Sequence, residues 1–187
     1  MKYNFVGYGS LLSHNSLSKT IKDKKFIPVV VKGYKRIFDL IEDNKKQDCL
    51  NVIKSKKDFF NAIMFSINEK ELTKIKERED VYNLEDVEVY DFKSRIKLGK
   101  ALISSDSIVG IDHKGLLPDR RYFILCREAA YHISKEFGKM WDKTTFTSKG
   151  IKISKWIKKH KGYDTIKNPK LITKLQIKLM EKVISLE

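Results

Sequence analysis

The stretch Tyr3-Asn4-Phe5-Val6-Gly7-Tyr8-Gly9-Ser10-Leu11-Leu12 joins a run of β-prone residues to a glycine-containing turn. Residues 3–7 predict a short strand, and Gly7 and Gly9 predict a tight backbone turn directly after it. The small residues of such a turn expose successive backbone N–H groups, which can bind an anionic group or a developing oxyanion. A plain connection would look the same, so the turn alone leaves both interpretations open.

Several familiar kinds of site do not fit the motifs. The turn lacks the third glycine of a dinucleotide loop, and no Gly-Lys-Ser/Thr follows it as in a P-loop. The four histidines form no His-x-x-x-His pair and no cluster with cysteine, so we expect no metal site. Cys126 and His132 lie about 120° apart around a predicted helix. Cys126 is therefore predicted to be a core residue rather than a nucleophile.

The composition is basic but gives little support to nucleic-acid binding. Of the 187 residues, 39 are Lys or Arg and 24 are Asp or Glu, which gives a formal net charge of +15. Only six of the cations are arginine, although proteins that recognise phosphates and bases favour the planar guanidinium. Lysine is instead spread over the whole chain, so we expect no nucleic-acid partner.

The chain length predicts one domain with an appendage. No run approaches the roughly 18 consecutive apolar residues of a membrane span. The N-terminus lacks the apolar region and cleavage site of a signal peptide. Cys49 and Cys126 form no Cys-x-x-Cys pair and no disulfide framework. We therefore expect a cytoplasmic protein that does not contact a membrane.

Periodicity along the chain predicts strands first and helices later. The expected strands cover residues 3–7, 26–31, 34–40, 50–53, 62–67, 87–92 and 100–104. The segments at 26–31 and 34–40 form two strands or one strand bent at Gly33, and a lysine-rich loop follows residues 50–53. Asn68, with Glu71 three residues later, predicts a helix cap. After Pro118, helical spacing predicts one long helix to about Trp141.

Glu79 stands out among the acidic residues that follow Asn68. Leu72 and Ile75 form the apolar stripe of this predicted helix, and Glu79 lies one helical turn beyond Ile75 on the same stripe. Glu77 points away from it. A carboxylate on an inward stripe is either held by local hydrogen bonds or acts as a general base, and position alone does not separate the two.

Four motifs in order resemble the gamma-glutamylcyclotransferase-like family. They are Tyr8-Gly9-Ser10-Leu11-Leu12, Gly33-Tyr34-Lys35-Arg36-Ile37-Phe38, Arg78-Glu79-Asp80-Val81-Tyr82 (which follows the strand Ala62-Ile63-Met64-Phe65-Ser66-Ile67 and a helix), and Pro118-Asp119-Arg120-Arg121-Tyr122. The resemblance covers about residues 3–140. It departs from the family at Leu11, where many members have a polar residue, and before the middle strand, where Asn61 or Ala62 replaces a glycine.

The resemblance implies an α+β fold with a small mixed, barrel-like β-sheet and flanking helices. Residues 1–145 would form this domain. Residues 146–187 would form a basic helical C-terminal extension packed on it, and ten lysines lie between residues 150 and 187.

The resemblance also implies a reaction that needs no metal and no cofactor. The α-amine of a gamma-glutamyl substrate attacks its own side-chain carbonyl, which yields 5-oxoproline and releases an amine. Glu79 would be the catalytic acid and base. The N–H groups of the turn Gly9, Ser10, Leu11 and Leu12 would bind substrate oxygen. Tyr8 and Tyr122 would line the pocket.

The alternative is a non-catalytic binding module on the same fold, which holds a small anionic ligand or a nucleic acid. The two hypotheses differ at Glu79. An enzyme needs this carboxylate in the cavity that faces the Tyr8–Leu12 turn, whereas a carboxylate turned to solvent would favour the binding module.

A helix is also expected at residues 168–185, and this expectation can be tested. Asn168-Pro169 is a typical helix start, and Leu171, Leu175, Leu179 and Val183 form one apolar face. Because such a face usually packs on the protein, deletion of this segment should lower the thermal stability and leave any affinity for DNA or RNA unchanged. Thermal unfolding and a nucleic-acid binding assay check this. Loss of such affinity in a truncated chain that still folds would contradict docking as the main role.

Overall fold

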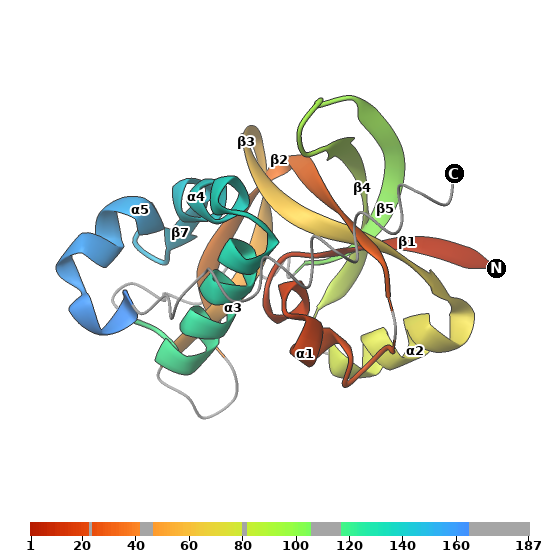
Figure 1. Cartoon of the computed structure of the whole chain (residues 1–187), viewed down its shortest axis with the longest axis horizontal. Helices are drawn as coiled ribbons and strands as arrows, with labels where there is room; N and C mark the ends of the chain where they lie inside the picture. The colour runs from red at the N-terminus through yellow and green to blue at the C-terminus, as the bar shows by residue number, and fades with distance from the viewer. Residues whose placement is uncertain (23, 42–46, 80–81, 106–116, 165–187) are drawn as a thin grey trace.

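A computed structural model describes residues 1–22, 24–41, 47–79, 82–105 and 117–164 (Figure 1). The strands are β1 (Lys2–Gly7), β2 (Phe26–Ile41), β3 (Gln47–Asn68), β4 (Asn83–Asp91), β5 (Lys97–Ser105), β6 (Leu117–Pro118) and β7 (Thr145–Thr147). The helices are α1 (His14–Leu17), α2 (Glu69–Arg78), α3 (Arg120–Ile133), α4 (Lys135–Thr144) and α5 (Ile153–Trp156). Short 3-10 turns are η1 (Ser10–Leu12), η2 (Ile157–Lys159) and η3 (Lys161–Tyr163).

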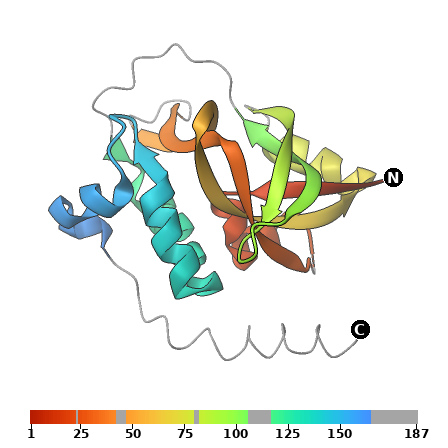
Figure 2. The same ribbon diagram turned by 90° about the horizontal axis from the view of Figure 1, so that it is seen from above.

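The strands form one mixed sheet with the order β6-β3-β1-β5-β4-β2-β7, and β2 also pairs with β3. That extra pairing closes β3, β1, β5, β4 and β2 into a ring, which is visible from above in Figure 2. β1 runs antiparallel to β3 and parallel to β5. This α+β architecture with flanking helices confirms the predicted fold class.

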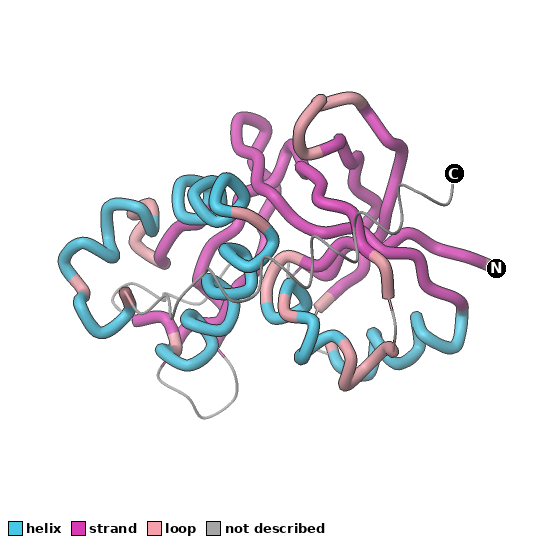
Figure 3. Tube along the Cα trace, viewed as in Figure 1, coloured by secondary structure: helices cyan, strands magenta, loops and turns pink. Residues whose placement is uncertain are grey.

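The helices lie in two groups, which Figure 3 shows in cyan around the magenta strands. α1 and α2 lie together near the ends of β1 and β3, whereas α3, α4 and α5 cover the other part of the sheet. Aromatic rings join the second group to β2. The Phe123 ring of α3 lies 5.5 Å from that of Phe38 on β2, and 5.8 Å from that of Trp141 on α4. Burial of these rings stabilises the contact between the helices and the sheet.

The longest hairpin corrects one sequence expectation. β2 is one strand bent at Gly33, where φ is +82° and the pairing with β3 is irregular, as one of the two alternatives predicted. Residues 54–57, however, belong to β3 and are not a loop. Their three lysines are exposed, so no alternation of apolar and polar residues marks the strand there.

The cap of α2 agrees with the sequence prediction. The Asn68 side chain accepts a hydrogen bond from the Glu71 N–H, and the Glu71 carboxylate accepts one from the Asn68 N–H. This capping box satisfies backbone donors at the helix start. Leu72 and Ile75 are buried, and α2 ends at Arg78 with Glu79 as its C-terminal cap.

The predicted long helix from Tyr122 to Trp141 is wrong, because Ser134 divides it into α3 and α4. Ser134 has extended backbone angles, and its hydroxyl accepts a hydrogen bond from the Phe137 N–H at the start of α4. A side chain that caps a new helix competes with continuation of the old one. At Gly138 a β-carbon would lie 2.3 Å from the Tyr131 ring, so glycine permits the close packing of the two helices.

A buried ion pair holds α3 and α4 together. Arg127 donates two hydrogen bonds to Asp142, at 2.8 and 2.9 Å, and the Tyr131 hydroxyl donates to the same carboxylate. Asp164, after η3, accepts a longer hydrogen bond of 3.3 Å from Arg127. The predicted terminal helix at residues 168–185 lies outside the described residues.

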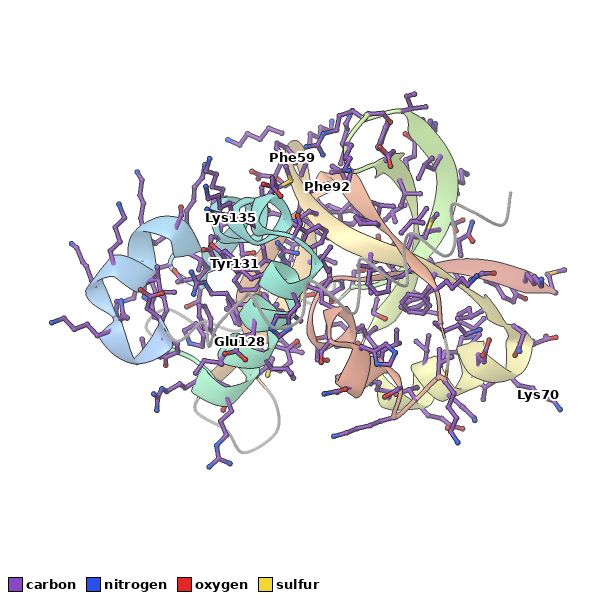
Figure 4. All side chains as sticks on the ribbon, in the orientation of Figure 1. Phe59, Lys70, Phe92, Glu128, Tyr131 and Lys135 are labelled. Atoms are coloured by element: carbon purple, nitrogen blue, oxygen red, sulfur yellow. The ribbon has the colours of Figure 1, made fainter. Side chains whose placement is uncertain are left out.

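Most of the described lysines occupy solvent positions. Lys70 on α2 and Lys135 on α4 are both exposed, and Lys70 points away from the protein in Figure 4. In the part of the chain that the structure describes, no helix has the length and apolar character needed to cross a membrane. The cytoplasmic location stays a prediction.

Arg36 on β2 is fully buried and joins four segments of the chain. Its guanidinium donates to both the backbone and the side-chain oxygen of Asn61 on β3, at 2.6 and 3.1 Å. It also donates to the Thr145 hydroxyl at 2.8 Å and, over 3.4 Å, to the Thr144 hydroxyl and the Tyr8 carbonyl. Because a buried cation needs hydrogen bonds in place of water, these acceptors fix the positions of the segments that supply them.

Replacement of Arg36 by lysine should therefore destabilise the protein strongly. An ammonium group keeps the charge but cannot reach the acceptors that a planar guanidinium spans, and each buried oxygen left unpaired costs about 1–3 kcal/mol. We expect Arg36→Lys to lower the free energy of unfolding by at least about 3 kcal/mol in urea denaturation. The same change at exposed Arg121 is the control and should cost less than about 0.5 kcal/mol. Equal effects at both positions would contradict the role of Arg36.

Candidate active site

A small pocket lies where the turn after β1 meets the end of α2. It encloses about 260 Å³ of empty space, part of which is open to solvent. Its walls come from six segments of the chain, and the lining residues are Val6, Tyr8, Gly9, Ser10, Leu11, Leu50, Glu79, Tyr82, Ser104 and Tyr122. The pocket thus brings together six of the seven residues that the sequence analysis selected. Leu12 is the seventh and does not line it.

The turn after β1 forms the 3-10 turn η1. The Leu12 N–H donates to the Gly9 carbonyl at 3.0 Å, and the Ser13 N–H donates to the Ser10 carbonyl at 3.1 Å. The N–H groups of Ser10 and Leu11 precede the first bonded N–H and are not used by the turn itself. Leu12 is buried beneath the turn, so its side chain serves the core.

Arg78 fastens this turn to the end of α2. Its guanidinium donates to the Ser10 hydroxyl at 3.0 Å, and to the carbonyl and the hydroxyl of Ser16, each at 2.8 Å. A further bond of 2.8 Å reaches the Thr20 hydroxyl. The planar group spans these acceptors with several donors at once, which holds α1 and the turn beside α2, as Figure 1 shows.

Glu79 lies in the pocket wall, and Glu77 is exposed on the opposite side of α2. The Glu79 side chain is 15% exposed, and its Oε1 atom lies 3.3 Å from Nε of Arg78. Its position follows from the end of the helix, because the Glu79 N–H still donates to the Ile75 carbonyl. The carboxylate is therefore held at the pocket by the last turn of α2.

Three tyrosines surround the space near Glu79. The Tyr82 hydroxyl donates to the Leu50 carbonyl at 2.7 Å. The Tyr8 hydroxyl faces Tyr82 without a well-formed hydrogen bond to it. Burial raises the pKa of Tyr8, Tyr82 and Tyr122 well above the usual value, and nearby Glu79 raises that of Tyr8 and Tyr82 further. All three hydroxyls are consequently protonated at neutral pH.

Tyr122 lies directly over the turn. The Asp119 side chain accepts a hydrogen bond from the Tyr122 N–H at 2.7 Å and thereby caps α3. A β-carbon on Gly9 would lie 2.7 Å from the Tyr122 hydroxyl. Glycine at position 9 thus permits α3 to close one side of the pocket.

Two polar residues of the pocket received no role from the sequence. Tyr82 is part of the Arg-Glu-x-x-Tyr motif, so its spacing from Glu79 was available as a signal. Ser104 reaches the pocket from β5, where it pairs with Leu84 of β4. No local motif marks it, because its place depends on strands that are distant in the sequence. Among the described residues, no three His, Cys, Asp or Glu side chains gather as metal ligands.

Comparison with protein-family models and with curated proteins finds no match. Solved structures do match. A gamma-glutamyl cyclotransferase superposes with a TM-score of 0.60 at 15% identity, over 85% of this chain and 99% of that one. An uncharacterized protein from Homo sapiens gives 0.60 at 14% identity, over 75% and 86% of the two chains. YkqA from Bacillus subtilis gives 0.57 at 16% identity, over 74% and 52%.

The ring-like mixed sheet with its two groups of helices defines an α+β protein with a pocket beside the first strand. More particularly, the chain has the gamma-glutamylcyclotransferase-like fold, which confirms the fold that the resemblance implied. At 14–16% identity the likeness concerns the fold, and the chemistry must be argued from the pocket.

The contact between Tyr122 and Gly9 can be tested by a double-mutant cycle. Gly9→Ala should lower the free energy of unfolding by about 1–3 kcal/mol, because the added methyl group overlaps the Tyr122 hydroxyl. In the Tyr122→Phe background the hydroxyl is absent, so the same change should cost clearly less. Urea denaturation of the four proteins measures the coupling. Identical costs in both backgrounds would show that Tyr122 does not limit the space at Gly9.

Proposed function

We propose that the protein is an intramolecular cyclotransferase that releases 5-oxoproline from a gamma-glutamyl compound. The observation that carries this proposal is the position of Glu79, a carboxylate in the wall of a pocket that the turn Tyr8–Leu11 lines from another side. This arrangement supports an enzyme over a binding module on the same fold. The likeness to a gamma-glutamyl cyclotransferase structure supports the same choice.

Glu79 would handle both protons of the reaction. Its carboxylate accepts a proton from the substrate α-ammonium, and the freed amine attacks the side-chain carbonyl carbon to form the ring C–N bond. As the tetrahedral oxyanion collapses, Glu79 gives this first proton to the leaving nitrogen and the bond from the carbon to that nitrogen breaks. Glu79, again a carboxylate, accepts the second proton from the ring nitrogen and passes it to the released amine, so the products are 5-oxoproline and an ammonium ion. One group can serve as base and as acid because both nitrogens are bonded to the same carbon in the tetrahedral intermediate.

The turn after β1 would stabilise the oxyanion. The N–H groups of Ser10 and Leu11 are not used within η1 and belong to residues that line the pocket. Fixed backbone donors of this kind stabilise developing negative charge without reorganisation. Arg78 would hold the turn and Glu79 at fixed positions relative to each other, since it donates to the Ser10 hydroxyl and contacts the Glu79 carboxylate.

The small size of the pocket suits this chemistry. A five-membered ring closure already has its nucleophile tethered to the electrophile, so the protein needs only to select one conformer and to move two protons. The rings of Tyr8, Tyr82 and Tyr122 would confine the gamma-glutamyl group. The leaving amine would lie toward the open side, which leaves amino acids, glutathione and simple amines as candidate leaving groups.

The proposal is tested by a screen for 5-oxoproline release from gamma-glutamyl amino acids, glutathione and gamma-glutamyl amines, followed by Glu79→Gln. The amide keeps the shape of the carboxylate but cannot accept the proton, so the rate should fall by at least about 10²-fold. The free energy of unfolding should change by less than about 1 kcal/mol, because a partly exposed ion pair contributes little.

Glu77→Gln is the matched control, since Glu77 is exposed on the same helix and should keep full activity. A fully active Glu79→Gln protein would overturn the assignment of the base. Equal losses in the two variants would mean that the pocket position of Glu79 has no special role. If no gamma-glutamyl compound yields 5-oxoproline, the proposed reaction is wrong.

A further inference from the structure

Two hydroxyl groups beside the pocket make no well-formed hydrogen bond in the described part of the chain, although that of Tyr8 faces Tyr82. They belong to Ser104 and Tyr8, whose side chains are buried, with residue exposures of 1% and 5%. Buried hydroxyls are normally paired, and an unpaired one needs an explanation. Both residues line the pocket, so a group on a bound ligand can supply the missing partner.

The charge around these hydroxyls favours an anionic group. Arg36 lies behind the turn and donates to the Tyr8 carbonyl, and its hydrogen-bond acceptors in the described residues are neutral oxygens. Burial lowers the pKa of Arg36 to about 9, and Tyr8 and Tyr122 lie close enough to this charge to offset part of that shift. The acidic residue in the pocket wall, Glu79, has its own cation in Arg78. A buried cation without a carboxylate on its guanidinium attracts an anion to the nearby cavity.

We propose that the hydroxyls of Tyr8 and Ser104 form a subsite for a carboxylate group of the ligand. Two separate donors match the two oxygens of a carboxylate, and hydrogen bonds to a charged acceptor are the stronger kind. The identity of this carboxylate rests on the proposed function: it is the α-carboxylate of the gamma-glutamyl group. The ammonium then faces Glu79, and the N–H groups of the turn face the side-chain carbonyl.

Ser105 provides a matched comparison on the same strand. Its hydroxyl is also buried, with 2% residue exposure, but neighbouring residues of a strand point to opposite faces, and Ser105 does not line the pocket. It faces Glu85, whose pKa it helps to lower, without a well-formed hydrogen bond. A purely structural effect of hydroxyl removal should therefore appear in both serines, and a ligand effect only in Ser104.

The experiment compares two rings that differ only in the carboxylate, 5-oxoproline and 2-pyrrolidinone. Their dissociation constants are measured by NMR titration for the wild-type protein, Ser104→Ala, Tyr8→Phe and Ser105→Ala. We expect Ser104→Ala and Tyr8→Phe each to weaken 5-oxoproline binding by about tenfold or more, the value of a hydrogen bond to a charged group. The affinity for 2-pyrrolidinone should change less than about twofold, and Ser105→Ala should bind both rings as the wild type does.

Thermal unfolding accompanies each titration. Loss of an unpaired hydroxyl should leave the three variants at least as stable as the wild type, so weaker binding cannot be ascribed to unfolding. An unchanged affinity of Ser104→Ala for 5-oxoproline would overturn the subsite. So would an equal loss for both rings, an equal effect of Ser105→Ala, or a wild-type protein without preference for the carboxylate.

Catalytic turnover is measured separately, which keeps the two proposals distinguishable. A protein that releases 5-oxoproline but shows no Ser104-dependent preference for the carboxylate retains the proposed reaction and loses the subsite. A protein that shows this preference but releases no 5-oxoproline retains the subsite as a carboxylate-binding site and loses the reaction.

Discussion

The buried guanidinium of Arg36 is the constraint on which the other parts depend. It is fully enclosed, and its acceptors come from the turn after β1, from β3, and from the junction of α4 with β7. The rings of Phe60 and Trp141 also lie near its central carbon, at 5.3 and 5.1 Å. Removal of a cation from water is costly unless its donors are all engaged. Sheet, helices and turn must therefore assemble around the same side chain.

The pocket follows from two arginines that act on one turn from opposite sides. Arg36 binds the Tyr8 carbonyl from the core, and Arg78 binds the Ser10 hydroxyl from the end of α2. A glycine between these two points accepts the close approach of Tyr122. A turn held in this way offers its backbone donors in a fixed direction, which is a requirement for electrostatic stabilisation of a transition state.

Local signals in the sequence predicted what local interactions determine. The capping box of Asn68 and Glu71 identified α2, and the stripe through Ile75 led to Glu79, because both depend on residues three or four apart. The break at Ser134 was missed, since helical spacing continues across it and only the cap geometry reveals the new helix. The place of Ser104 in the pocket could not be predicted from the sequence, because it depends on the pairing of β5 with β1 and β4.

The difference between local signals and long-range contacts also explains why the chemistry of this chain is harder to infer than its fold. Four motifs and the ring-like sheet agree on the architecture, yet 14–16% identity to the matched structures leaves the pocket side chains to be argued one by one. The proposed catalytic role of Glu79 rests on its position across the pocket from the turn. The proposed binding role of Ser104 rests on its buried hydroxyl, which lacks a hydrogen bond. Of the buried hydroxyls that lack a well-formed hydrogen bond, those of Tyr8 and Ser104 belong to residues that line the pocket, where a ligand can complete them. The pocket chemistry therefore depends on side chains that the fold brings together from distant parts of the sequence.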